Sequence, residues 1–245
     1  MQIYIRKNYE SLSNFAATEI LNCVKYKPDA VLCFASGNSP QLTFQLLAQK
    51  AKVENVDFSQ ITFIGFDEWV GISPENEGSC GYFLKQNVVI PLGLSAVQVH
   101  LFDALANDLE AECEKMNQLI KAKGGIDLMV VGIGMNGHIG FNEPHIPIDN
   151  YAHVADLEPV TQSVGQKYFT ESTVLKQGIT LGLKHLLEAN NVLLLANGAH
   201  KSAIVQKALQ LDININLPAT LIRQHAKSVV VLDEAAAALL HFSQV

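Results

Sequence analysis

The sequence lacks the features that mark secreted, membrane-spanning or disulfide-stabilised proteins. Its four cysteines, Cys23, Cys33, Cys80 and Cys113, are widely spaced and include no C-x-x-C pair, which predicts buried or half-buried thiols in a reducing cytoplasm. No uninterrupted apolar run reaches the roughly 18 residues that a transmembrane helix needs. The first residues, M-Q-I-Y-I-R-K, contain no apolar core of a signal peptide. We therefore expect a cytoplasmic protein without a membrane span.

Positive charge is also scarce. The chain has 17 lysines and arginines against 24 aspartates and glutamates, which gives a net charge of -7. This balance argues against nucleic acid or an anionic membrane as the main partner. A site for a small anion would have to supply its positive potential locally.

The pattern of apolar residues predicts an α/β fold. With 245 residues, 49% of them hydrophobic, the chain suits a single sizeable domain, 1–245. Apolar runs alternate with amphipathic segments, which predicts an open, mainly parallel sheet with helices on both faces, Rossmann-like and doubly wound. We expect strands at 3–5, 30–35, 61–66, 97–102, 126–131, 179–183, 191–196 and 228–232. We expect helices at 9–25, 40–52, 80–89, 108–123, 160–169, 184–189, 200–211 and 218–224, and an alanine-rich closing helix. The weakly patterned segment 145–177, called the lid segment below, is typical of a cover over an active site.

Residues 126–144 form the most informative stretch, a short apolar run followed by G-I-G-M-N-G-H-I-G-F-N-E-P. Gly132, Gly134 and Gly137 spell G-x-G-x-x-G after a strand, a pattern that can bind a dinucleotide if a helix begins within the glycines. Further glycine and proline follow closely, which argues against a helix there. The glycines are better explained by close approach of the backbone to a small ligand.

Two predicted strands end in residues suited to anion binding or proton transfer. Asp67 and Glu68 follow the strand at 61–66; a carboxylate pair beside an apolar strand can have one raised pKa, which suits a general base, although an acidic loop would look the same. The strand at 30–35 runs into a helix through Ser36, Gly37, Asn38 and Ser39. Backbone N–H groups and hydroxyls at a helix start can bind an anion, and a plain N-cap at Ser39 with Pro40 at the first helical position is the alternative.

Two further strand ends carry candidate site residues. Asn136, His138 and Glu143 follow the strand at 126–131, where a histidine between polar partners can act as acid or base or be purely structural. Metal binding is disfavoured, because His138 and Glu143 do not have a helical ligand spacing and no second histidine is near. Lys201, at a helix start after the strand at 191–196, could meet a phosphate or could be a solvated lysine.

The motifs S-G-N-S-P, F-D-E-W-V-G, G-I-G-M-N-G-H-I-G-F-N-E-P and N-G-A-H-K, in this order, resemble the glucosamine-6-phosphate deaminase/isomerase family. The resemblance covers essentially the whole chain, and the G-H-I-G-F-N-E-P run is its most specific part. K-P-D-A-V, D-E-W-V, P-L-G-L, K-G-G-I-D-L and I-T-L-G-L-K are most similar to a galactosamine-6-phosphate deaminase/isomerase-like branch.

The resemblance implies a reaction and roles for these residues. An amino-sugar 6-phosphate becomes a ketose 6-phosphate and ammonia, with no metal and no organic cofactor. Asp67 would move the proton from C2 to C1, His138 would open the pyranose ring with Glu143 paired to it, and Asn136 stands where some relatives have aspartate. The phosphate would lie on the loop Gly37, Asn38 and Ser39 with Lys201. Lys167 stands where many relatives have a lid arginine.

Two other functions compete with this reading. One is 6-phosphogluconolactonase, a hydrolase of the same superfamily, and the other is a sugar-phosphate sensor, which should carry a DNA-binding helix-turn-helix that this acidic chain has no room for. Trp69, where glucosamine deaminases more often have tyrosine, favours galactosamine 6-phosphate, with tagatose 6-phosphate as product. The chain lacks the longer C-terminal tail of hexameric relatives, so we expect a monomer or small homo-oligomer.

Overall fold

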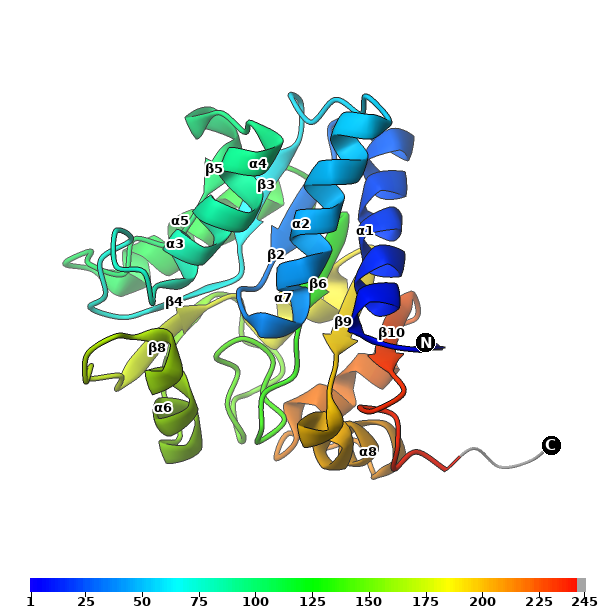
Figure 1. The fold of residues 1–245 in the computed structure, drawn as a ribbon. Helices are drawn as coiled ribbons and strands as arrows, with labels where there is room; N and C mark the ends of the chain where they lie inside the picture. The colour runs from blue at the N-terminus through cyan, green and yellow to red at the C-terminus, as the bar shows by residue number, and fades with distance from the viewer. Residues whose placement is uncertain (242–245) are drawn as a thin grey trace.

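A seven-stranded parallel sheet forms the centre of the protein, as the computed structural model of the chain shows for residues 1–241 (Figure 1). Every pairing within it is parallel, as the alternation of strands and helices predicts. Its strands, in spatial order, are β1 (Gln2–Arg6), β10 (Ser228–Asp233), β9 (Val192–Ala196), β6 (Leu128–Val131), β2 (Val31–Phe34), β3 (Thr62–Gly65) and β5 (Val99–His100).

Helices cover both faces of this sheet, so the predicted doubly wound arrangement is confirmed. Successive residues of the central strands alternate between two cores: Leu32 and Phe34 pack with residues of α1 and α2, whereas Val31 and Cys33 pack with residues of α5 and α8. Burial on both faces explains why these strands are continuous apolar runs. The α-helices are α1 (Tyr9–Tyr26), α2 (Asn38–Val53), α3 (Cys80–Leu84), α4 (Ile90–Leu92), α5 (Leu109–Ala122), α6 (Pro159–Gly165), α7 (Leu183–Glu188) and α8 (Ser202–Gln210).

A second, three-stranded antiparallel sheet was not predicted. It consists of β4 (Asp67–Trp69), β8 (Gln177–Thr180) and β7 (His153–Asp156), in the order β4-β8-β7. The strand expected at 179–183 belongs to this sheet and not to the parallel one. Two of its strands have only three or four residues with mixed burial, which is too short for a recognisable two-residue period. In Figure 1 this sheet and α6 form a lobe beside the carboxyl ends of the central strands.

The start of α2 differs from its prediction. The helix begins at Asn38, not Pro40, and its N-cap is Gly37, not Ser39. Gly37 has φ 131°, a conformation that favours glycine. The Ser39 hydroxyl is free of a capping role because it donates to Asn197 Oδ1 at 2.8 Å.

The helix expected at 80–89 also runs further than predicted. It passes through a π-helical turn (Lys85–Val89) into α4 and ends at Gly93, whose φ is 67°. Pro91 directly follows this π turn, at the second residue of α4. Proline therefore does not end this helix; the left-handed glycine does.

The predicted alanine-rich closing helix is wrong. Residues 234–239 form turns, although the Asp233 carboxylate accepts from Ala236 N at 2.7 Å, as an N-cap residue would. The same carboxylate also accepts from Gly198 N at 2.9 Å. The carbonyl of Leu239 accepts from the Gln206 side chain of α8 instead of from a following helical turn. Similarly, the expected strand at 97–102 shrinks to β5, since Ala96–Gln98 is a 3-10 turn.

The remaining short turns are also 3-10 in type: Gln166–Tyr168, Ala199–Lys201 and Pro218–Gln224. The helix predicted at 160–169 is confirmed as α6 followed directly by Gln166–Tyr168. Across residues 1–241, none of the helices is both long and apolar enough to cross a bilayer.

Candidate active site

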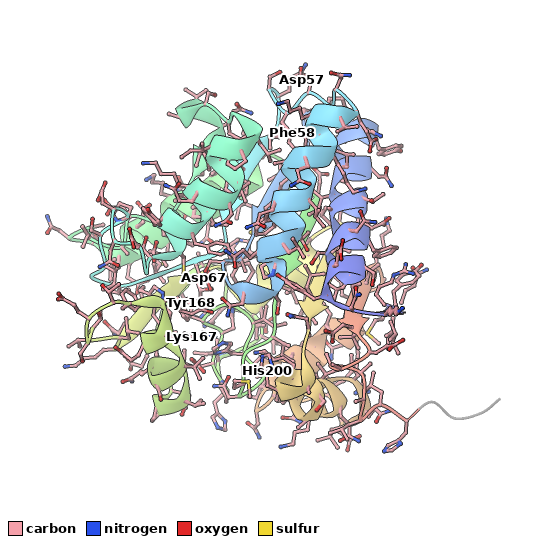
Figure 2. All side chains as sticks on the ribbon, in the orientation of Figure 1. Asp57, Phe58, Asp67, Lys167, Tyr168 and His200 are labelled. Atoms are coloured by element: carbon pink, nitrogen blue, oxygen red, sulfur yellow. The ribbon has the colours of Figure 1, made fainter. Side chains whose placement is uncertain are left out.

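A cavity of about 310 Å³ lies at the carboxyl ends of the central strands, where the antiparallel lobe meets the loops after β2, β6 and β9. This volume is in the range of small-molecule sites. Figure 2 shows Asp67, Lys167, Tyr168 and His200 at this end of the molecule, far from Asp57 and Phe58. The residues that the sequence predicted for the site line the cavity with two exceptions: Glu143 is buried behind His138, and Glu68 is buried beside Asp67. The predicted strand-end residues therefore meet in one place.

One end of the cavity has the properties of an anion site. The first residues of α2, Asn38 and Ser39, lie there, and a 16-residue helix directs its free N–H groups and positive dipole end toward it. The hydrogen bond from Ser39 Oγ to Asn197 Oδ1 joins this loop to the loop after β9.

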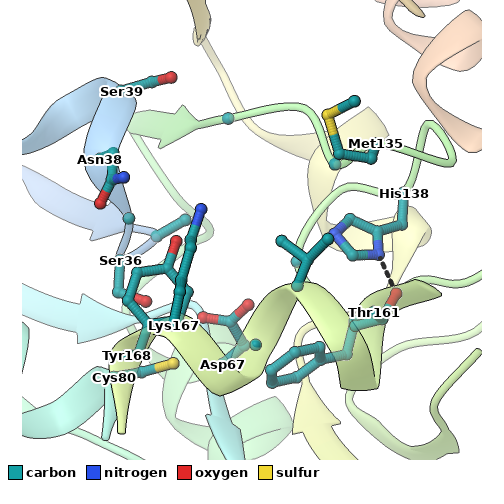
Figure 3. Close-up of a pocket in the computed structure, with 18 of the residues that line it drawn as sticks. Ser36, Asn38, Ser39, Asp67, Cys80, Met135, His138, Thr161, Lys167 and Tyr168 are labelled. Carbon is teal, nitrogen blue, oxygen red and sulfur yellow. Dashed lines mark hydrogen bonds between the residues drawn. The ribbon is translucent and has the colours of Figure 1, made fainter. Parts of the chain in front are cut away.

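Two lysines add positive charge at the same end. Lys201 is half-buried, and its ammonium donates to the carbonyl of Ile133 at 2.7 Å. Burial, and then the neighbouring charge of Lys167, lower the pKa of Lys201 to about 8. Lys167 reaches the cavity from the lid segment with its Nζ 4.8 Å from the centre of the Tyr168 ring (Figure 3). A bound dianion would relieve the repulsion between the two ammonium groups.

Asp67 and Glu68, adjacent in β4, occupy different environments. Asp67 faces the cavity, and its Oδ1 is a buried atom with no hydrogen-bond partner among the described residues. Burial, and then the negative charge of Glu68, raise the pKa of Asp67 to about 7. Glu68 is 4% exposed and accepts from three backbone N–H groups, of Trp69 at 2.8 Å, Cys80 at 2.9 Å and Gly81 at 2.7 Å. Burial raises the pKa of Glu68, and these three donors act against that rise. Because Asp67 lines the cavity and Glu68 does not, Asp67 is the member of the pair suited to exchange a proton with a ligand.

His138 belongs to a network of four side chains. Its Nδ1 lies 3.3 Å from Glu143 Oε1 and 3.1 Å from Thr161 Oγ1. Asn136 completes the network, because its Nδ2 donates to Glu143 Oε2 at 2.6 Å and its Oδ1 accepts from the His138 backbone at 3.2 Å. Burial acts to raise the pKa of Glu143, but His138, Thr161 and Asn136 outweigh it and lower the pKa. The network therefore holds a carboxylate behind the imidazole and leaves the other ring nitrogen facing the cavity (Figure 3).

The glycines of the G-I-G-M-N-G run make room for side chains rather than for a nucleotide. A Cβ at Gly134 would lie 2.0 Å from the His138 ring, and one at Gly137, whose φ is 84°, would lie 2.2 Å from Leu217. Residues 132–152 contain no helix, so the structural context that a dinucleotide needs is missing. Gly134 and Gly137 are thus explained by packing against His138 and Leu217. Gly132 and Gly134 also line the cavity, so the close approach of this backbone to a ligand stays a prediction.

Several residues of the site could not be identified from the sequence pattern. Thr161 reaches His138 from the lid helix α6, and Cys80 and Tyr168 line the cavity beside Asp67. Trp69 packs between Phe141, with ring centres 4.6 Å apart, and Phe169, with ring centres 6.1 Å apart. These contacts join segments distant in the chain, so spacing in the sequence could not reveal them.

Comparisons with known proteins agree with this geometry. A family described as "Glucosamine-6-phosphate isomerases/6-phosphogluconolactonase" matches residues 6–231. A glucosamine-6-phosphate deaminase of Halothermothrix orenii is 34% identical over 98% of this chain and 100% of its own. AgaI of Escherichia coli (strain K12), a provisionally named deaminase, is 37% identical over 93% of this chain and 90% of its own.

Two solved structures extend the comparison. A monomeric glucosamine-6-phosphate deaminase of the NagB superfamily superposes with TM-score 0.95 at 33% identity, covering 98% of this chain and 100% of its own. A 6-phosphogluconolactonase from Thermotoga maritima has TM-score 0.76 at 20% identity, covering 95% of this chain and 99% of its own, and shares the fold. The chain belongs to the glucosamine-6-phosphate isomerase/6-phosphogluconolactonase family, and it is an enzyme.

Proposed function

We propose that the protein converts an amino-sugar 6-phosphate into a ketose 6-phosphate and ammonia. The observation that carries the proposal is the placement of Asp67 and His138 on one cavity whose far end holds the α2 N-terminus, Lys167 and Lys201. A sugar held by its phosphate at that end would present its reacting carbons to the carboxylate and the imidazole. The names of the relatives support the same chemistry.

The proposed reaction begins with ring opening at His138. The Nε2 lone pair takes the proton of the anomeric hydroxyl and returns it to the ring oxygen, which leaves an open aldehyde. Glu143, paired with Nδ1, stabilises the transient imidazolium, and Asn136 holds Glu143 in position.

Asp67 then carries out the isomerisation. Its carboxylate removes the C2 proton, the electron pair forms the C1–C2 double bond, and the carbonyl oxygen on C1 takes a proton from the substrate ammonium, which gives a neutral enolamine; the protonated Asp67 next delivers its proton to C1. The product is a C2 imine, which water hydrolyses to the ketose and ammonia. A pKa of about 7 lets Asp67 act first as base and then as acid near neutral pH.

The phosphate contacts belong to the same proposal. Gly37, Asn38 and Ser39 would bind it through the N-terminus of α2, together with the ammonium of Lys201. Lys167 would add a second charge from the lid segment, as a point charge without the planar fork of arginine. Ser36 lines the cavity next to this loop and completes its wall.

For the epimer, we propose galactosamine 6-phosphate, converted to tagatose 6-phosphate, over glucosamine 6-phosphate. This choice rests on the tryptophan at position 69. A site that hydrogen-bonds one C4 hydroxyl orientation rejects the other, because buried polar groups are then left unpaired. The test is the ratio of kcat/KM for the two epimers; a ratio above about ten for galactosamine 6-phosphate, roughly 1.4 kcal/mol, supports the choice, and the same ratio for glucosamine 6-phosphate overturns it.

The activity itself is tested by measuring ammonia and ketose 6-phosphate from both epimers. The same preparation is assayed for hydrolysis of 6-phosphogluconolactone, with a 6-phosphate sugar that lacks the amino group as a blank. Equal amounts of ammonia and ketose support the proposal. Lactone hydrolysis without ammonia release would favour the hydrolase, and ligand binding without either reaction would favour a sensor.

We also propose that one chain is a complete catalytic unit. Every group used above comes from a single chain, and a relative of high structural similarity is monomeric. Specific activity that stays constant on dilution supports this, and a loss of activity on dilution contradicts it.

A further inference from the structure

Thr161 is the one side chain of the lid helix α6 that bonds to the His138 network. It is 5% exposed, and its Oγ1 lies 3.1 Å from His138 Nδ1, the contact drawn as a dashed line in Figure 3. Glu143 Oε1 lies 3.3 Å from the same nitrogen. The imidazole is therefore held between a carboxylate from its own loop and a hydroxyl from the lid segment.

This arrangement determines which nitrogen of the neutral His138 ring carries the proton. A neutral imidazole has one N–H and one lone pair. With Nδ1–H directed at Glu143 and Thr161, the lone pair is on Nε2, which faces the cavity (Figure 3). The Thr161 hydroxyl can accept from Nδ1 while donating to the Glu143 carboxylate, so both partners of the histidine are tied to α6.

The same piece of chain also carries Lys167. The 3-10 turn Gln166–Tyr168 follows α6 without a break, so Thr161 and Lys167 are at the two ends of one continuous helical segment. Its middle is seated on the core, because a Cβ at Gly165 would lie 2.6 Å from the Trp69 ring and 2.9 Å from Leu175. Because the segment is short and packed on the core, a displacement of Lys167 is transmitted to Thr161.

We propose that Thr161 is a positioning residue for His138, and that the lid segment makes ring opening depend on the phosphate held by Lys167. The inference rests on the proposed function. The 6-phosphate of the sugar holds Lys167, which keeps α6 on the core and the Thr161 hydroxyl on Nδ1. A sugar without the phosphate leaves α6 held by its core packing alone, so the contact from Thr161 to Nδ1 is held less firmly. Binding energy from the non-reacting phosphate is thereby used at the ring oxygen.

The test compares Thr161→Val, which keeps the shape and removes the hydroxyl, with Thr161→Ser, which keeps the hydroxyl. Ser163→Ala, at an exposed position of the same helix, is the matched control. We expect Thr161→Val to lower kcat/KM roughly tenfold, the scale of one hydrogen bond to a catalytic group. Thr161→Ser and Ser163→Ala should stay within about threefold of wild type. Equal losses in the Val and Ser variants would overturn the proposal, since they would indicate packing and not hydrogen bonding.

An isotope effect separates positioning from a general loss of structure. With substrate deuterated at C2, wild type should show a primary isotope effect on kcat/KM for the Asp67 step. If Thr161→Val slows only ring opening, that step limits the rate and the isotope effect falls toward one. An unchanged isotope effect with a lower rate would contradict the assignment to His138.

A double mutant tests the coupling. Lys167→Met combined with Thr161→Val should be no slower than Lys167→Met alone, because the methionine variant already fails to seat the lid segment. Additive losses would show that the two residues act independently and would remove the coupling from the proposal.

A readout without turnover keeps this inference separate from the proposed function. The ¹⁵N chemical shifts of His138 report its tautomer, and we expect a protonated Nδ1 in wild type with fructose 6-phosphate bound. Thr161→Val should shift the ring toward a mixture of tautomers. Absence of ammonia release by wild type would overturn the proposed function, whereas identical His138 shifts in both proteins would overturn the role of Thr161.

Discussion

Two adjacent carboxylates in β4 show how backbone surroundings divide tasks between similar side chains. Glu68 accepts from the backbone N–H of Trp69 in β4 and from those of Cys80 and Gly81 at the start of α3, and these donors oppose the rise that burial causes in its pKa. Asp67 has no such donors on Oδ1 and faces the cavity. Burial, and then the negative charge of Glu68, raise the pKa of Asp67 to about 7, which keeps a proton within reach near neutral pH. Cys33, Cys80 and Tyr168 also face Asp67, and burial raises the pKa of each of these three groups, so they remain neutral.

Replacing Asp67 by asparagine should abolish turnover and stabilise the fold. We expect kcat to fall by about two to four decades, the usual contribution of a general base. The pKa of Asp67 is about 7 in the folded protein, against an ordinary value of 3.8. The contribution of Asp67 to the free energy of unfolding is therefore fully present below the unfolded-state pKa of 3.8 and is lost as pH rises toward the folded-state pKa of about 7. Between these two values the folded state holds a proton that the unfolded state has released.

The measurement is Tm of Asp67→Asn and wild type at pH 8 and pH 4, together with ammonia release. The variant should melt higher than wild type at pH 8, and the difference should shrink at pH 4, where folded wild type keeps Asp67 protonated and the unfolded chain is close to half protonated. More than a tenth of wild-type activity, or a lower Tm at pH 8, would contradict the role and the environment given to Asp67.

Replacing Glu68 by glutamine should move the pH profile. Without the neighbouring negative charge the pKa of Asp67 is lower, so the acid limb of kcat/KM should shift to lower pH. Glu77→Gln is the control, since Glu77 also lines the cavity but is exposed, where solvent screens its charge. An acid limb that stays in place in Glu68→Gln, or moves equally in both variants, would refute the electrostatic role.

The site residues that directly follow a strand could be predicted from the sequence. The site residues that reach the cavity from other segments could not. Asp67 and His138 follow buried strands, and the carboxyl ends of parallel strands share one edge of a sheet. Thr161 reaches the site from a segment with weak periodicity, and a single threonine hydroxyl carries no pattern. Its contact with His138 depends on how α6 packs, which only the tertiary structure determines.

The lid helix α6 shows how an element is seated by small residues and aromatic rings. Gly165 has no side chain, so the Trp69 ring can lie against α6. Gly78, in the loop before α3, likewise leaves space for the Phe169 ring. Trp69, Phe141 and Leu175 form a separate small core under the lid segment. The tryptophan at position 69 and the glycine at position 165 are therefore a matched pair.

Replacing Gly165 by alanine should lift the lid segment from this core. Alanine favours a helix over glycine by about 1 kcal/mol, so any loss of activity must come from the clash with Trp69. We expect a roughly tenfold rise in KM for the phosphorylated sugar, comparable to losing one well-packed contact. Trp69→Phe in the same chain should restore part of the loss by removing the clashing ring edge, whereas Ser163→Ala should have little effect. No change in Gly165→Ala, or no rescue, would contradict this seating.

Among the elements, long helices and buried strands were predictable and short or capped ones were not. The helix α1 and the central strands have strong apolar periods that match their burial. The alanine-rich segment after β10 has high helix propensity, but the carbonyls of Leu239 and His241 accept from the side chains of Gln206 and Gln210 of α8. Tertiary contacts of this kind override propensity and are invisible in a hydrophobic pattern.

The whole molecule combines a net charge of -7 with a cavity that holds two lysines and a helix N-terminus. The parallel sheet was predictable because its strands are buried on both faces, whereas the antiparallel lobe that carries Asp67 was not, since its strands are short. The lobe and the sheet edge together form the cavity, so the complete site could not be predicted from the parallel sheet alone. Positive potential is local, as an acidic protein that binds an anion requires.

Inorganic phosphate should therefore stabilise the protein through this cavity. At a concentration of about 100 times Kd, a ligand that binds only the folded state adds about 2.7 kcal/mol, which raises Tm by roughly 5 to 10 °C for a chain of this size. Lys201→Ala should remove most of the shift, because the Lys201 ammonium is half-buried at the phosphate end and regains its charge fully on binding a dianion. Lys207→Ala, an exposed lysine of α8, should retain the shift. Melting curves in phosphate and in sodium chloride of equal ionic strength separate binding from screening; an equal rise in both salts, or an equal loss in both variants, would show that this end of the cavity does not bind phosphate.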